Sequence, residues 1–373
     1  MDVSFTPEQE LLRSAVRDVL DEQCPTSLVR EVAEAGSQAV GGQRLWTRIA
    51  ELGWMGLALD EAHGGSGLGM IDVAIVAEEM GRALLPVPWF TTVALFAEAI
   101  RAAGSREQRD RWLPQVAAGQ LRGTVALLEP DAIRRSEHGP MTATANNGGY
   151  VLGGAAAFVP ELGAADLVVV VARLEGQPSL FVVDRARLQT VDEPTLDSTR
   201  RLGTAVIDSV AVDSDRLLGG EPCSWPVVEK VTDRATAILA AEMCGGAQKV
   251  LDLAVEYARQ RTQFGRPIGS FQGVSHRCAD MLLAIESARS LAYYAAWCCD
   301  NDEPAAPLAV SAAKAWAGDT YRSATAQAIQ IHGGLGFTWE ADLHLWYRRA
   351  FWSASVLGDP VDHRERVATL IGL

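Results

Sequence analysis

Hydrophobic residues recur at helical spacing over positions 6–119. Thr6-Pro7-Glu8 is a favourable helix start, because it combines a hydroxyl N-cap, proline at the first helical position and an acid in the first turn. A glycine-rich break at 63–67 precedes a second helical stretch, predicted at 72–84. The helical spacing i, i+3, i+4, i+7 is clearest at Leu12, Ala15, Val16 and Val19.

The pattern changes to short apolar runs over 120–224. Gly, Asn and Pro separate these runs, as at Asn146-Asn147-Gly148-Gly149, which is typical of strands joined by tight turns. We predict a small β-barrel or sandwich here. The expected strands are 124–128, 150–152, 156–159, 167–172, 179–183 and 205–212.

Helical spacing returns over 225–373, now in longer stretches. Long amphipathic helices with short links predict a four-helix bundle. The sequence therefore indicates an α+β chain with three domains: helical 1–119, β 120–224 and helical bundle 225–373. The spacing is clearest at Val250, Leu253, Ala254 and Tyr257, and at Met281, Ala284, Ile285 and Ala288.

Composition narrows the functional classes. The 373 residues are 48% hydrophobic and carry a formal net charge of −14, which disfavours nucleic acid and anionic lipid as partners. The longest apolar run, 167–172, is too short for a membrane span, and the polar, acidic start at 1–10 lacks signal-peptide character. Six cysteines without CxxC spacing are consistent with reduced thiols, so we expect a cytoplasmic protein without a cysteine metal site.

Two motifs in the C-terminal segment carry the chemistry. One is RTQFGRPIGSFQ at 261–272 and the other is QIHGGLGFTWE at 330–340. Together with EAHGGSG at 61–67 and EEMG at 78–81, they resemble the signatures of the acyl-CoA dehydrogenase family, and the α–β–α order is similar too. A Rossmann motif does not fit 334–336, which lacks a third glycine and follows a helical pattern.

The resemblance implies an FAD site shared between subunits. A guanidinium and free backbone amides suit the FAD pyrophosphate. In the family, the first motif contacts the FAD of the neighbouring subunit, and the second contacts its adenosine half. The alternative is that Arg261 caps a helix and the glycines only form a turn. The implied contacts are Arg261, Phe264, Gln272, Gln330, Gly333 and Gly334.

The middle segment departs from the family pattern. Glu129-Pro130 is present and is implied to lie near flavin and substrate, but the usual Gly-Ser-Asp-like turn does not follow. Phe158 stands where relatives place a Trp beside the flavin ring, and Pro160 where many place a flavin-binding Thr. The alternative for Phe158 is an ordinary core position.

The proton-abstracting base also departs from the family. Leu357 stands where most relatives have Glu before Gly, and Ala235 stands at a second known position. Glu242 is the sole acid in an apolar run, where a raised pKa would suit a base, and the resembled steroid-degrading enzymes have a base in such a stretch. The alternative is an ion pair with a bundle arginine. Asp359 is the second candidate.

Two functions from different classes follow from the resemblance. The first is an active FAD-dependent dehydrogenase of the Cα–Cβ bond of an acyl-CoA, with electron-transfer flavoprotein as acceptor and a homo- or hetero-oligomeric assembly. The second is a weakly active or silent subunit that completes the FAD site of a heteromeric enzyme. A flavoprotein oxidase or nitroalkane-type enzyme is a third option. Small residues near Glu242 suggest a bulky, steroid-like or branched acyl group.

Overall fold

The computed structural model describes residues 5–36, 39–128, 141–223 and 225–373. The chain forms two compact units that each draw on distant parts of the sequence. The helical unit comprises Met1–Arg30, Gly69–Leu85 and Thr236–Leu373, and the mixed unit comprises Glu31–Leu68 and Pro86–Ala235. Spatial grouping thus differs from the linear α–β–α order, because two N-terminal segments join the C-terminal helices.

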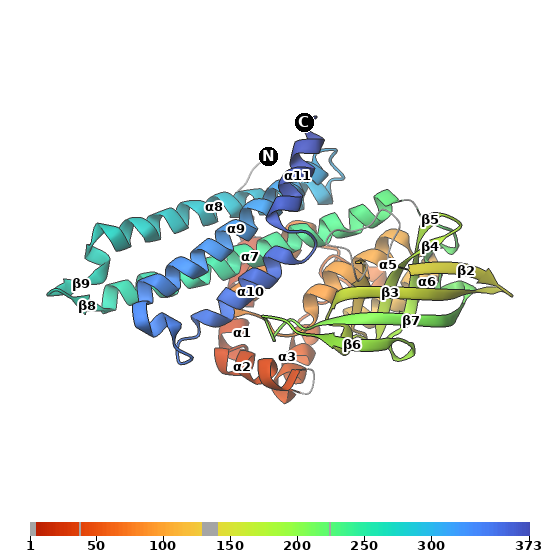
Figure 1. Ribbon diagram of the computed structural model, residues 1–373, viewed down its shortest axis with the longest axis horizontal. Coiled ribbons are helices and arrows are strands. Elements are labelled where there is room, and N and C mark those ends of the chain that lie inside the picture. Colours follow the sequence, from red (N-terminus) through yellow and green to blue (C-terminus); the bar gives the residue numbers. More distant parts are fainter. Residues whose placement is uncertain (1–4, 37–38, 129–140, 224) are drawn as a thin grey trace. The chain divides into compact units, whose positions relative to one another are not determined.

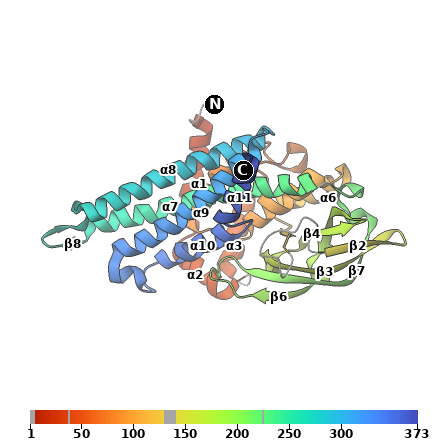
Figure 2. The same ribbon diagram turned by 45° about the horizontal axis from the view of Figure 1, so that its top comes forward.

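Helix α9 (Ala306–His332) is central to the helical unit. It packs against α8 (Gln272–Asp300), α10 (Leu343–Ser355) and α11 (Pro360–Leu370), and Figures 1 and 2 both show α8 and α9 running side by side. These helices pack through many buried alanines, whose small side chains let helices approach closely. The remaining helices are α1 (Pro7–Gln23), α4 (Met70–Ala83) and the larger part of α7 (Trp225–Gln260).

The predicted helix start at Thr6 is confirmed. The Thr6 hydroxyl accepts a hydrogen bond from the backbone N–H of Gln9 at 3.2 Å, and the Gln9 side chain accepts from the backbone N–H of Thr6 at 3.1 Å. This capping box satisfies two amides that the first helical turn leaves unpaired. The predicted helix at 72–84 is confirmed as α4, with a difference of at most two residues at its ends.

Within the described residues, seven strands of the mixed unit form one sheet, in the order β1-β4-β2-β3-β7-β6 with β5 paired to β4. Its core is a cluster of buried apolar residues, most of them on β3, β4 and β7, which also includes Phe181 of β5 and Leu217. The strands are β1 (Gly123–Ala126), β2 (Met141–Asn146), β3 (Gly149–Pro160), β4 (Leu167–Leu174), β5 (Gln177–Asp184), β6 (Gln189–Glu193) and β7 (Leu202–Asp213). Helices of this unit are α3 (Val40–Glu51), the π-helical η3 (Phe90–Ala97), α5 (Glu98–Ala103) and α6 (Arg106–Ala117); α2 (Thr26–Ala35) crosses the boundary between units.

All six cysteines are free, as expected from their spacing. Burial raises the pKa of the Cys24 thiol to about 12, so this thiol stays protonated at neutral pH. In the described part of the chain, no helix is both long and apolar enough to cross a membrane.

Candidate functional site

The two C-terminal motifs lie together at the ends of α7 and α9. The Tyr257 ring, in the last turn of α7, stacks on His332, the last residue of α9, with ring centroids 4.3 Å apart. The backbone N–H of Arg261 donates to the Tyr257 carbonyl at 2.8 Å, so the first motif begins directly beyond the stack. His332 is followed at once by Gly333. The stack therefore fixes the two motifs beside each other.

A two-stranded hairpin carries the first motif. Strands β8 (Thr262–Gln263) and β9 (Arg266–Pro267) pair across Phe264 and Gly265. Both turn residues have positive φ, 51° and 79°, which is the conformation of the tight turns favoured in β-hairpins. Phe264 is 92% exposed. A phenylalanine held in the left-handed region and presented to solvent indicates a binding role rather than a folding one.

The glycines of the second motif have different roles. A Cβ at Gly336 would lie 2.6 Å from the Ile329 carbonyl oxygen, so this glycine is required by packing. A Cβ at Gly333 or Gly334 would meet no atom within 4 Å. Gly333 ends α9 with φ +60°, as the turn alternative requires, but the backbone of both glycines is open to an approaching group.

Arg261, Gln272 and Gln330 complete the predicted FAD contacts. All three are exposed. Within the described residues, the Arg261 guanidinium forms no salt bridge. Gln272 opens α8 and lines a groove of about 490 Å³, together with His276 and Arg277 on α8 and Gln327 on α9. An exposed guanidinium, an exposed aromatic ring and open glycine backbone fit the needs of a dinucleotide pyrophosphate.

Glu242 lies deep in the helical unit rather than at its surface. Its side chain is about 3% exposed and forms an ion pair with Arg349 of α10, 3.2 Å from the arginine Nη1. Arg349 is equally buried. This is the ion-pair alternative left open by the sequence. The carboxylate lies directly against a cation, so an apolar setting does not describe the residue.

The small residues around Glu242 make room for a helix. A Cβ on Gly81 of α4 would lie 1.9 Å from the Glu242 carbonyl oxygen, and a Cβ on Gly245 would lie 1.7 Å from that of Glu78. A Cβ on Gly246 would lie 2.3 Å from the Tyr321 hydroxyl oxygen. These glycines permit the close crossing of α4 and α7, and they do not leave space for an acyl chain.

Asp359 is the N-cap of α11. Its Oδ1 accepts hydrogen bonds from the backbone N–H groups of Val361 at 2.7 Å and Asp362 at 2.8 Å. The residue before it in the turn, Gly358, has φ +101°, and Leu357 has φ +62°. A leucine in this region costs roughly 1–2 kcal/mol. Asp359 therefore caps the helix that Pro360 begins.

Phe158 lies on β3 of the mixed unit, at a bulge between Ala156 and Val159. Its φ is +52° and 47% of its surface is exposed, so the core alternative does not hold. The Pro160 carbonyl accepts a hydrogen bond from the Thr124 hydroxyl at 2.6 Å. Glu129, the other residue that the resemblance implies in this region, lies outside the described residues.

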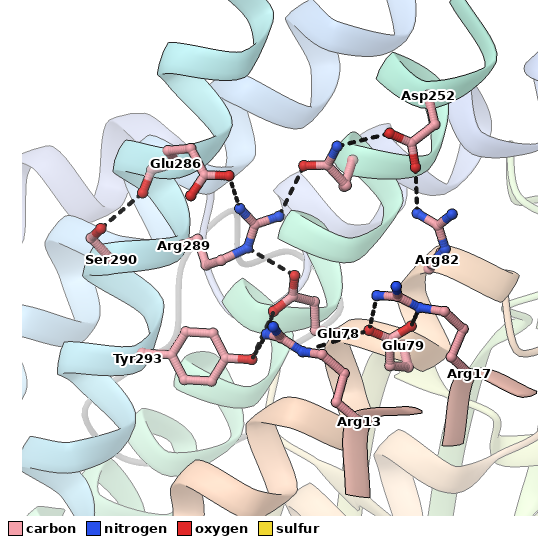
Figure 3. Close-up of polar contacts among 11 residues, drawn as sticks. Arg13, Arg17, Glu78, Glu79, Arg82, Asp252, Glu286, Arg289, Ser290 and Tyr293 are labelled. Atoms are coloured by element: carbon pink, nitrogen blue, oxygen red, sulfur yellow. Dashed lines mark hydrogen bonds and ion pairs between the residues drawn. The ribbon is translucent and has the colours of Figure 1, made fainter. Parts of the chain in front are cut away.

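A buried polar network joins α1, α4 and α8 and was missed by sequence reasoning (Figure 3). The Glu78 carboxylate accepts from the Tyr293 hydroxyl at 2.7 Å and from Arg289 Nε at 2.9 Å, and Arg13 lies 3.4 Å away. Glu79 is held by Arg17 at 2.7 Å. The signal was present in EEMG: two adjacent acids within an apolar helix require partners. Burial, followed by the charge of Glu78, raises the pKa of Tyr293.

Comparisons with known proteins show the family of the chain. The model of the acyl-CoA dehydrogenase N-terminal domain matches residues 6–120, and that of the C-terminal domain matches residues 225–359. Acyl-CoA dehydrogenase IpdE2 of Mycolicibacterium smegmatis is 32% identical over 97% of this chain and 98% of its own length. The chain belongs to the acyl-CoA dehydrogenase family. It is thus an oxidoreductase of a flavoprotein family, as the two motifs led us to expect.

Solved structures agree with this assignment. A structure of a variant of the Tcur3481-Tcur3483 steroid ACAD matches with a TM-score of 0.87 and 31% identity, over 98% of this chain and 97% of that one. The ChsE4-ChsE5 complex from Mycobacterium tuberculosis matches with a TM-score of 0.90 and 26% identity, over the full length of both chains. The predicted fold class is confirmed, and the chain is similar to members of the steroid type.

Proposed function

We propose that this acyl-CoA dehydrogenase family member binds FAD and oxidises the Cα–Cβ bond of an acyl-CoA thioester. The observation that carries the proposal is the Tyr257–His332 stack, which places an exposed arginine, an exposed phenylalanine and two open glycines at one end of the helical unit. When bound, FAD would supply the hydride acceptor. The protein would supply binding, orientation and proton removal.

Each residue at this end would have a distinct part in binding. Arg261 would neutralise the pyrophosphate through charge-assisted hydrogen bonds. Phe264 would present an apolar face to the cofactor, while Gly333 and Gly334 would let it approach the backbone. Gln272 and Gln330 would donate and accept side-chain hydrogen bonds. The resemblance alone supports Phe158 and Glu129 as flavin contacts.

Glu242 remains our proposed base. Its carboxylate, the group that would accept the proton, is already engaged by Arg349 at 3.2 Å. Proton abstraction by Glu242 would therefore require the Arg349 contact to loosen when substrate binds. Asp359 is the fallback, although its Oδ1 already accepts two backbone hydrogen bonds.

We propose a bulky, steroid-like or branched acyl group as substrate. The support is the likeness to a structure described as a steroid ACAD. The glycines near Glu242 lend no support, because α4 and Tyr321 occupy the adjoining space. Electron-transfer flavoprotein is the proposed acceptor and the cytoplasm the proposed compartment, as the resemblance implies.

A partner subunit that completes the FAD site of a heteromeric enzyme is the second candidate. Two observations favour it. The carboxylates of Glu242 and Asp359 already have partners, Arg349 and the backbone of α11. Two of the matching structures, ChsE4-ChsE5 and Tcur3481-Tcur3483, are each named for two proteins. Such a subunit would contribute its cofactor-binding end while another chain removed the proton.

Purification of the chain alone, and together with the product of an adjacent gene, tests both candidates. Flavin absorbance per chain is measured first, and flavin bleaching under anaerobic conditions is then followed with octanoyl-CoA and with a steroid side-chain CoA thioester. FAD binding and bleaching by the chain alone support the first candidate. Bleaching only in the complex supports the second, and no flavin in either preparation overturns both.

A further inference from the structure

Lys314 is a buried cation in the middle of α9. Its side chain has no exposed surface. Its ammonium donates hydrogen bonds to the Ala354 carbonyl at 2.9 Å and the Gly358 carbonyl at 2.7 Å. Burial lowers the pKa of Lys314 to about 7, although Asp359 and Asp362 partly oppose this shift. A lysine buried at such a cost indicates that the carbonyls require a donor.

The two acceptors of Lys314 flank one short segment: Ala354 lies in the last turn of α10, and Gly358 lies in the α10–α11 loop, defined here as residues 356–359. Leu357 lies between the two acceptors. Its own carbonyl accepts from His363 Nε2 at 3.0 Å, which identifies Nε2 as the protonated ring nitrogen. The carbonyls of Ala354 and Gly358 are thus bound by Lys314 of α9, and that of Leu357 is bound by His363 of α11.

We propose that Lys314 is a positioning residue that holds the α10–α11 loop so that the side chain of residue 357 faces the reaction site in one fixed direction. Leucine rarely adopts φ +62°, and the hydrogen bonds from Lys314 to carbonyls before and after Leu357 help to hold it there. Leu357 occupies the place of the usual base, and the inference therefore rests on the proposed function.

Amide hydrogen exchange tests the anchor without reference to activity. In Lys314→Met, the amides of 356–359 should exchange at least roughly 10-fold faster, because both hydrogen bonds are lost. Peptides of the N-terminal half of α8 should not change. Lys249→Met, the same substitution at a half-exposed lysine of α7, should leave the loop as it is. Unchanged exchange in a folded Lys314→Met protein overturns the proposal. If that variant does not fold, Lys314→Gln takes its place: its shorter side chain should not reach both carbonyls, so faster exchange of 356–359 is again expected and unchanged exchange again overturns the proposal.

Installing a base at residue 357 tests the direction of its side chain. In a Glu242→Gln background, Leu357→Glu should raise the rate of flavin reduction at least 10-fold, measured with whichever of the two acyl-CoA probes reduces the unmodified protein faster. Adding Lys314→Met should remove this gain at equal FAD content. A gain that survives Lys314→Met, or no gain from Leu357→Glu, overturns the proposal. Because exchange needs no turnover, it separates failure of the anchor from failure of the proposed function.

Discussion

Arg261 is the residue on which we expect FAD binding to depend most directly. Its guanidinium is exposed and stands next to the hairpin that presents Phe264. Arg261→Ala should weaken FAD binding by about 10–100-fold, the value of a charge-assisted hydrogen bond of roughly 1.5–3 kcal/mol. Flavin absorbance per chain after gel filtration measures this. Arg44→Ala, an exposed arginine of α3, is the matched control, and equal flavin loss in both variants would contradict the assignment.

One substitution at Glu242 tests both its proposed role as the base and its observed ion pair with Arg349. Glu242→Gln removes the basicity and leaves Arg349 without its counter-ion, so flavin reduction should slow by roughly 10²–10⁴ and unfolding should become easier by up to about 3–5 kcal/mol. Asp359→Asn should change both much less, because asparagine caps a helix about as well as aspartate. Stopped-flow flavin bleaching and urea unfolding are the measurements.

The outcomes for these two carboxylates discriminate between the candidate functions. A Glu242→Gln protein that is less stable but bleaches its flavin at the unmodified rate shows that the residue is only structural. If Asp359→Asn alone slows bleaching, Asp359 is the base. If neither substitution affects bleaching in a complex with a second chain, the partner-subunit function is favoured, because the proton is then removed by another polypeptide.

Lys314 makes stability depend on pH in a defined window. Its pKa is about 7 in the folded protein and near 10.5 when exposed, so between these values the unfolded chain holds a proton that the folded chain has released. Stability from this residue therefore rises with pH from about 7 to 10.5, by at most about 1.4 kcal/mol per pH unit, and is constant below 7. Urea unfolding of the native protein and of Lys314→Met across this range should show a difference in stability that grows with pH in favour of the native protein, because groups such as Cys24 and Tyr293 titrate alike in both. Parallel curves would contradict the expectation.

At the scale of elements, the close crossing of α4 and α7 depends on glycines, which have no side chain. Gly81→Ala and Gly245→Ala would each place a Cβ within 2 Å of a backbone carbonyl oxygen, so the helices would have to separate. We expect each to lower the free energy of unfolding by about 3 kcal/mol or more. Gly273→Ala in the first turn of α8 meets no atom within 4 Å and should be neutral or stabilising by up to about 1 kcal/mol. Thermal unfolding of the three variants checks this order.

Local signals predicted some elements and not others. The start of α1 follows from Thr6, Pro7 and Gln9, which are adjacent in sequence. The predicted strands at 150–152 and 156–159 are one strand, β3, which continues through register shifts. Strands β2 and β6 were missed because their residues are mostly polar and exposed, and they are fixed by pairing with β3 and β7.

Contacts between distant segments explain what the sequence could not predict about the site. Glu242 was recognised as an unusual acid, but its partner Arg349 is 107 residues later and becomes visible only once α10 is placed. From the sequence, Gly245 indicated open space. Helix α4 fills that space, but it lies far earlier in the chain, so the residues near Gly245 do not reveal it. The two FAD motifs were recognised because each is contiguous. Their proximity depends on the stack between Tyr257 and His332.

At the scale of the whole molecule, the exposed end of the helical unit predicts a neighbour. Phe264, Phe337 and Trp339 are 92%, 78% and 65% exposed in a single chain. Aromatic side chains exposed to this extent mark binding surfaces. In the family, the motif that contains Phe264 serves the cofactor of the adjacent subunit. We therefore expect a dimer or a dimer of dimers, formed either by copies of this chain or with a second polypeptide.

Sedimentation velocity combined with flavin absorbance tests this expectation. In native protein or its complex, FAD should sediment only with species larger than the 40.0 kDa chain. Phe264→Ser should reduce the amount of bound FAD, because the ring would contact the neighbour's cofactor, whereas Leu11→Ser, another exposed apolar position, should not. A monomer that keeps a full complement of FAD would contradict the shared site. FAD loss from Phe264→Ser only in the heteromeric complex would show that the cofactor served by this hairpin belongs to the second chain.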